Sequence, residues 1–163
     1  SNPFLGTFDG DGYVITGLSI NRSSEDLVGL FSGVGDSTTV VTGVSVVDAD
    51  ITGDRQVGIL AGKNRDTVSE SYVKGEISGN DNVGGLVGTN SATVKNSSAY
   101  GNVDGSSEVG GLIGDSGDRG TVSNSHAAMD VNASNNRVGG LIGLNEGRVE
   151  KSHATGPGRH YGR

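Results

Sequence analysis

The chain has 163 residues, of which 30 are glycine, 20 serine and 13 asparagine, and it contains no cysteine. Only 32% of the residues are hydrophobic, and the formal net charge is −7. These values exclude a disulfide framework and a cysteine-ligated metal site, argue against a helical bundle and a nucleic-acid partner, and leave no apolar run long enough for a membrane helix.

A repeat runs through most of the chain. A hexad, which reads Val-Gly-Gly-Leu-Val-Gly in its third copy, begins near residues 28, 57, 83, 109 and 138. A second block of the form Val-x-x-Ser-x-Ala, or a close variant of it, follows the last four hexads and begins at residues 68, 94, 122 and 149. A disordered chain would not keep such phased apolar blocks, so the pattern favours a repeat architecture.

The segment before the repeats differs from them. Residues 1–27 concentrate aromatic side chains, and a hairpin-like turn is expected at residues 9–12. An alternating strand should follow, with Val14, Leu18 and Ile20 on one face. We interpret residues 1–27 as an N-terminal capping coil, residues 28–155 as five repeats and residues 156–163 as an irregular tail. Insertions at residues 36–42 and 117–120 should form loops.

Each repeat of about 26 residues contains three short stretches rich in Val and Ile, separated by residues that favour turns. Three strands per unit predict an all-β parallel β-helix, or β-solenoid, of five to six coils. Equivalent side chains should stack inside it as columns. The predicted core columns are Phe31, Leu60, Leu86, Leu112 and Leu141, and Val68, Val94, Val122 and Val149. A serine column at residues 71, 97, 125 and 152 should bond to backbone groups at a corner.

The hexads and the blocks that follow them resemble the GLUG motif, most closely at residues 85–88, 111–114 and 140–143. The resemblance implies a secreted or cell-surface β-solenoid protein, because this motif recurs in adhesin-like proteins and in non-catalytic parts of some peptidases. It marks a scaffold rather than a set of catalytic residues.

One outward row of side chains is the candidate binding face. Tyr72, Ser98, His126 and His153 occupy equivalent repeat positions and should lie side by side. Two stacked imidazoles could share a metal, but no third ligand is evident, and an exposed ladder without a metal is the favoured interpretation.

Asp9 and Asp11 carry oxygen ligands of the kind that calcium prefers. The spacing of a calcium loop is missing, so a tight turn is favoured and no cofactor is expected. The threonines do not align by repeat, which argues against an ice-binding face.

No catalytic residue is assigned, because the acidic residues are scattered and the loops that would build a cleft are absent. The favoured function is a non-catalytic extracellular or cell-surface structural module: an adhesin-like stalk, or a subunit of a filament or layer. Its partners would be other domains of a larger protein or identical subunits stacking end to end. The alternative is a module that binds a glycan or a host protein through the outward face or the inserted loops, and an enzyme fragment that degrades polysaccharide is a third reading.

Overall fold

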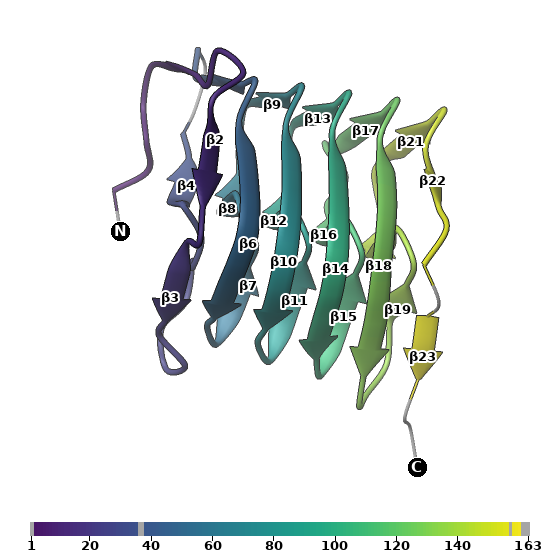
Figure 1. The fold of residues 1–163 in the computed structure, drawn as a ribbon. Coiled ribbons are helices and arrows are strands. Elements are labelled where there is room, and N and C mark those ends of the chain that lie inside the picture. Colours follow the sequence, from purple (N-terminus) through teal and green to yellow (C-terminus); the bar gives the residue numbers. More distant parts are fainter. Residues whose placement is uncertain (1, 36–37, 157, 161–163) are drawn as a thin grey trace.

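A computed structural model describes residues 2–35 and 38–156, and the backbone of residues 158–160. These residues form strands and turns, without a helix that could span a membrane. The strands wind into a β-solenoid whose coils stack in the order of the sequence (Figure 1). Every pairing between neighbouring coils is parallel. The predicted all-β parallel β-helix is therefore confirmed.

Each complete coil contributes one strand to each of four sheets. The broad sheet contains β2 (Val14–Thr16), β6 (Ser45–Thr52), β10 (Tyr72–Ser78), β14 (Ser98–Gly105), β18 (His126–Ala133) and β22 (His153–Ala154), with β3 (Ser19–Asn21) and β23 (Gly158–His160) added beside β6 and β18. The threonine sheet contains β1 (Thr7–Asp9), β5 (Val40–Thr42), β9 (Thr67–Ser69), β13 (Thr93–Lys95), β17 (Thr121–Ser123) and β21 (Arg148–Glu150).

The remaining strands come from the hexads and form two glycine sheets. The first contains β7 (Arg55–Val57), β11 (Asp81–Gly84), β15 (Ser107–Gly110) and β19 (Val138–Gly139). The second contains β4 (Phe31–Val34), β8 (Ala61–Asn64), β12 (Val87–Asn90), β16 (Ile113–Ser116) and β20 (Ile142–Asn145). The prediction of three strands per coil was wrong, because each of the last four hexads bends in its middle and so supplies two strands.

Glycine lets these two sheets approach at backbone distance. A Cβ built on Gly84 would lie 2.6 Å from the backbone nitrogen of Gly114, and one on Gly114 would lie 2.6 Å from that of Val83. Real Cβ atoms do not approach backbone atoms so closely. The spacing of the glycines in the hexad therefore follows from the contact between the two sheets.

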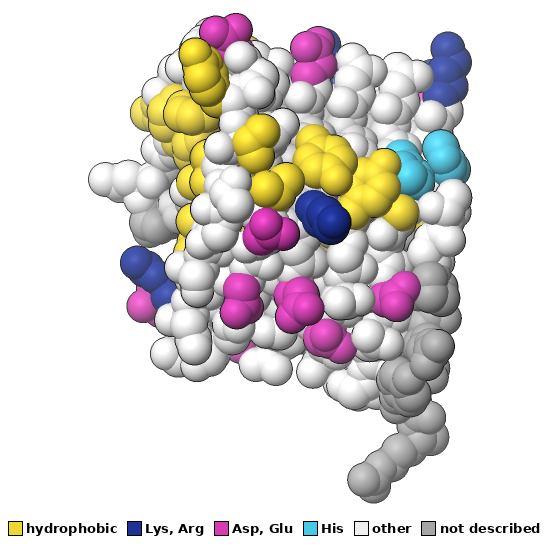
Figure 2. Space-filling model, in the orientation of Figure 1, with side chains coloured by type: hydrophobic (Ala, Val, Ile, Leu, Met, Phe, Trp, Pro, Cys, Tyr) yellow, Lys and Arg dark blue, Asp and Glu magenta, His cyan; other side chains and the backbone are white. Residues whose placement is uncertain are grey.

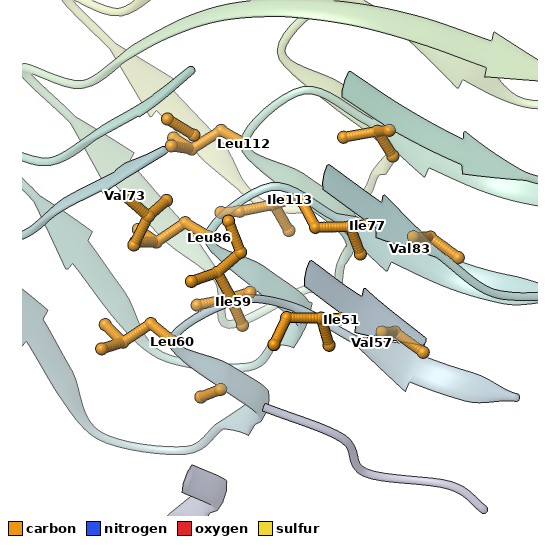
Figure 3. Close-up of a cluster of buried hydrophobic side chains, with 14 of the residues drawn as sticks. Ile51, Val57, Ile59, Leu60, Val73, Ile77, Val83, Leu86, Leu112 and Ile113 are labelled. Carbon is orange, nitrogen blue, oxygen red and sulfur yellow. The ribbon is translucent and has the colours of Figure 1, made fainter. Parts of the chain in front are cut away.

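The interior is filled by columns of apolar side chains, one from each coil. Leu60, Leu86 and Leu112 are fully buried and stack in line (Figure 3). Their backbones form a ladder in which each N–H donates to the carbonyl of the next coil, at 3.0 Å from Leu60 to Leu86 and 2.9 Å from Leu86 to Leu112. A second column runs along the threonine sheet, with Val68, Val94 and Val122 fully buried.

The two ends of these columns differ from the interior. Val149, expected in the core, is 38% exposed, because it lies in the last of the stacked coils. Leu141 is only partly buried for the same reason. At the other end Phe31 is also partly buried, and its strand is shifted so that it lies opposite Ala61 instead of Leu60. The ring of Phe31 packs against two other phenylalanines of the N-terminal segment, Phe4 and Phe8, at centroid distances of 5.1 and 5.4 Å.

Buried polar side chains complete the corners, and the predicted serine column is confirmed. Ser71, Ser97 and Ser125 are buried, and the backbone N–H of each donates to the serine hydroxyl of the next coil at 3.1–3.2 Å. Each hydroxyl donates in turn to a carbonyl two residues earlier, at 2.7–2.8 Å. These bonds satisfy polar groups in a core that has few apolar residues.

A second polar corner lies where the second glycine sheet ends. The Asn64 amide donates to Asn90 Oδ1 at 2.9 Å, and both asparagines bond to backbone two residues further on. Ser116 takes the same position in the next coil, where the insertion at residues 117–120 forms a tight turn. Among the described residues the Ser116 hydroxyl is buried without a partner.

Several local predictions were wrong. The turn at residues 9–12 is a corner between two sheets, not a hairpin, since β1 and β2 pair with different neighbours. Gly17 adopts a left-handed φ of 71°, which breaks the expected alternation and leaves Val14 exposed while Leu18 and Ile20 are partly buried. Residues 40–42 of the first expected loop form β5, while residues 36 and 37 lie outside the described chain. In the tail, residues 158–160 form β23.

The threonines also align better than expected. Thr67, Thr93 and Thr121 lie in register on the outward face of the threonine sheet. The row is short, because Val40 and Arg148 occupy the same position in the flanking coils. The argument from unaligned threonines was therefore incorrect in its premise.

Candidate functional site: the aromatic row of the broad sheet

The structure brings the four residues of the candidate binding face together. Tyr72, Ser98, His126 and His153 occupy directly opposite positions on β10, β14, β18 and β22. Their side chains point outward, because the alternate positions on these strands carry the buried residues of the core. Figure 2 shows hydrophobic side chains in a row on this face that continues into two neighbouring histidines. We call Tyr72, Ser98, His126 and His153, together with Tyr100, the aromatic row.

Tyr100 belongs to the aromatic row but was missed in the sequence. It lies two residues after Ser98 on β14, and therefore on the same face of the sheet. Its ring lies 5.2 Å from that of Tyr72 and 5.5 Å from that of His126, measured between centroids. Ser98 is too small to fill the space between its larger neighbours. The two-residue period of the strand was the signal that could have identified Tyr100.

The two imidazoles form a stacked pair at the C-terminal end of the row. The ring centroids of His126 and His153 are 4.5 Å apart, with an interplanar angle of 25°. His126 Nδ1 lies 3.3 Å from the Tyr100 hydroxyl, and Nε2 lies 3.1 Å from the hydroxyl of Thr155. Burial lowers the pKa of His126 below its ordinary value, and the neighbouring His153 lowers it further. The lowered pKa favours the neutral form of His126, and that form can accept a hydrogen bond or bind a metal.

A shallow groove of about 350 Å³ runs beside the aromatic row. Its polar lining comes from Asp48, Asp50, Lys74, Glu76 and Asn102. A β-bulge lies next to it, where the pairing of β6 with β10 shifts register. Figure 2 shows acidic side chains gathered on this part of the face, with one basic side chain among them. The groove therefore offers mainly hydrogen-bond acceptors beside aromatic rings.

The other predicted positions lie elsewhere. Asp9 Oδ1 accepts a hydrogen bond from the Asp11 backbone N–H at 2.9 Å, which is the geometry of a tight turn. Within the described residues there is no group of three or more His, Asp or Glu side chains that could hold a metal ion. The turn at residues 117–120 precedes the threonine sheet, which separates it along the chain from the broad sheet. The loop and the aromatic row therefore do not form one surface.

The fold and the glycine hexads define a β-solenoid built from a short repeat. The GLUG motif family matches residues 134–156, which contain the last hexad and its Val-x-x-Ser-x-Ala block. This match confirms the predicted resemblance to GLUG-repeat proteins at the last repeat of the chain.

The chain is also similar to Halomucin from Haloquadratum walsbyi, with 43% identity over 65 residues. The matched region is 40% of this chain but only 1% of that protein. No solved structure matches the chain.

Proposed function

We propose that this chain is a rigid, non-catalytic structural module of an extracellular or cell-surface protein. The observation that carries the proposal is the continuous stacking of the coils: all four sheets run from coil to coil, with only local register shifts at β4 and at the bulge of β6. The same columns of buried side chains and the same backbone ladders run from coil to coil, so we expect no hinge between the described repeats. A stalk or layer subunit requires this kind of rigidity.

The comparisons support this setting. GLUG repeats and the similarity to a protein named Halomucin both fit a surface structural role. The net charge of −7 favours solubility and is of the sign expected to repel other acidic surfaces. The matched region is about 1% of this relative, so the relative's own activity and partners are not carried over to this chain.

Rigidity can be measured with two spin labels. The chain lacks cysteine, so Thr7→Cys and Arg148→Cys would provide unique attachment sites on the threonine sheet. Five steps of coil stacking separate them, which is about 24 Å at the usual interstrand spacing. Double electron–electron resonance should give one narrow distribution of distances between the two spin labels, centred near this value. A broad or bimodal distribution would overturn the rigid module.

Localisation needs a separate test in the organism that encodes the chain. An antibody raised against the purified chain should label intact cells or the culture medium. Labelling that appears only after the cells are lysed would refute a surface or extracellular role.

The two ends of the solenoid differ in a way that bears on its partners. Phe4, Phe8 and Phe31 pack together at the N-terminal end of the core, whereas Val149, which belongs to a core column, is 38% exposed at the other end. An exposed strand edge can pair with another strand. We therefore propose that a further domain, or an identical subunit, contacts the C-terminal coil. Light scattering over a range of concentrations should show self-association that is suppressed by Val149→Asp, and a strictly monomeric chain would count against identical subunits.

The groove beside the aromatic row favours a second candidate function, binding of a glycan or a host protein. Aromatic rings beside hydrogen-bonding side chains are a common arrangement in ligand sites. A glycan array should then show binding that is lost in Tyr72→Ala and kept in Thr93→Ala on the threonine sheet. Absence of binding to the array and to host-protein extracts would leave the structural role alone.

An enzyme fragment that degrades polysaccharide has less support. Asp50 and Glu76 lie opposite one another in register, but they line an open, shallow groove instead of the cleft in which paired carboxylates normally act. Hydrolysis of a polysaccharide that is abolished by Glu76→Gln would overturn the non-catalytic assignment.

A further inference from the structure

The stacked imidazoles of His126 and His153 indicate a metal site in addition to the proposed structural function. His126 and His153 belong to successive coils, and directly opposite residues of neighbouring strands keep their side chains on one face at short range. The ring centroids are 4.5 Å apart. His153 is exposed, so its ring can rotate and bring a nitrogen toward the same point as His126 Nε2. We propose that His126 and His153 together bind one divalent transition-metal ion of the Cu²⁺, Ni²⁺ or Zn²⁺ class.

Tyr100 supplies the outer contact that such a site needs. Metal-binding histidines usually donate their second ring N–H to an acceptor, which fixes the tautomer and orients the ring. The Tyr100 hydroxyl lies 3.3 Å from His126 Nδ1 and can accept this hydrogen bond. Nε2 is then left with its lone pair for the metal. Tyr100 acts here as a positioning residue.

The donor set selects the class of metal. Imidazole nitrogens suit copper, nickel and zinc, whereas calcium and magnesium require oxygen ligands. Two imidazoles are the protein ligands and water completes the coordination, because no third histidine or carboxylate joins them among the described residues. The Thr155 hydroxyl, 3.1 Å from His126 Nε2, would have to give up its contact with this nitrogen when the ion binds.

The site would act as a clamp on the last coil. His126 lies on β18 within the stack, while His153 lies on β22, whose two residues are both exposed. A metal that bridges the two strands binds only when β22 is docked, so binding stabilises the docked state by mass action. A bound metal would therefore hold the exposed strand β22 against the rest of the solenoid.

Isothermal titration with Zn²⁺ or Ni²⁺ would test the chelate. All proteins should carry His160→Ser, so that only His126 and His153 remain as imidazoles, and should lack a histidine tag. The parent should bind one ion per chain. Serine is the natural residue at the equivalent position 98, so His126→Ser and His153→Ser should fold normally, which far-UV circular dichroism would verify.

Loss of either imidazole should weaken binding about 100-fold, because the second ligand acts at high effective concentration. Tyr100→Phe should weaken it about tenfold without changing the stoichiometry. Amide exchange in β21 and β22 should slow when the metal is added to the parent, but not when it is added to His153→Ser. Binding that falls only twofold in each single variant, as for two independent imidazoles, would overturn the proposal, and so would unchanged amide exchange at saturating metal.

Discussion

Replacing Gly110 with alanine should destabilise the solenoid by about 3 kcal/mol, because the contact between the two glycine sheets leaves no room for a Cβ. A Cβ built there lies 2.6 Å from the Gly143 nitrogen and 2.9 Å from Ile142 Cα, and closer still to the Ile113 carbonyl oxygen. All three neighbours are backbone atoms, so no side-chain rotation can relieve the clash. The strands themselves would have to shift.

Gly117→Ala is the matched control, since the nearest atom to its built Cβ is the Asn90 carbonyl oxygen at 4.0 Å. Thermal unfolding followed by far-UV circular dichroism should show a Tm about 6–12 °C lower for Gly110→Ala. The Tm of the control should be unchanged or slightly higher, because alanine reduces the entropy of the unfolded chain. Equal melting temperatures for the two variants would refute the close-packing explanation of the hexad.

The same unfolding assay checks three further predictions. Asn90→Ala should lower the free energy of unfolding by about 2–3 kcal/mol, because it breaks a buried amide network. Ser116→Ala at the equivalent position should change it by less than about 0.5 kcal/mol, because the lost hydroxyl has no partner within the described chain. Equal costs for the two variants would contradict this account. Val122→Ala should cost about 2 kcal/mol and Val149→Ala less than half of that, since the first is fully buried and the second is 38% exposed; a larger loss at Val149 would contradict it. Burial, then the nearby Glu108 and Glu146 carboxylates, raise the pKa of Asp115 from its ordinary 3.8 in the folded chain. Stability is therefore lost as the pH rises from about 3.8 through the raised pKa, and Asp115→Asn should stabilise the chain at pH 7 but not below about pH 3.5. A gain that persists at low pH would exclude this cause.

The solenoid architecture could be predicted from the sequence because the same pattern of apolar and turn residues recurs in successive coils. Each coil places a Leu, a Val and a Ser at equivalent positions, and stacked strands must put equivalent residues in columns. The number of strands per coil was missed because the hexad reads as one apolar stretch. Its bend depends on backbone contact between the two glycine sheets across successive coils, as between Gly84 and Gly114, and the spacing of apolar residues does not reveal that contact.

The candidate site was only partly predictable. Repeat alignment identifies residues in the same register, which is why Tyr72, His126 and His153 were found. It does not identify a long side chain that reaches across from a neighbouring register, as Tyr100 does over Ser98. The hydrogen bond between Tyr100 and His126 and the contact with Thr155 depend on side-chain length and direction, which a pattern of residue positions does not contain.

Inward and outward positions of the repeat are under different structural constraints, and this difference indicates where a ligand site can form. Inward positions are restricted to side chains that fit narrow columns, and the hexad glycines are restricted by contact between backbones. Outward positions of the broad sheet carry neither restriction. One register row therefore holds Tyr72, Ser98 and His126 in successive coils without disturbing the ladder beneath them. Changes in this row can create or remove a ligand site while the stability of the solenoid is maintained by the columns and the glycines.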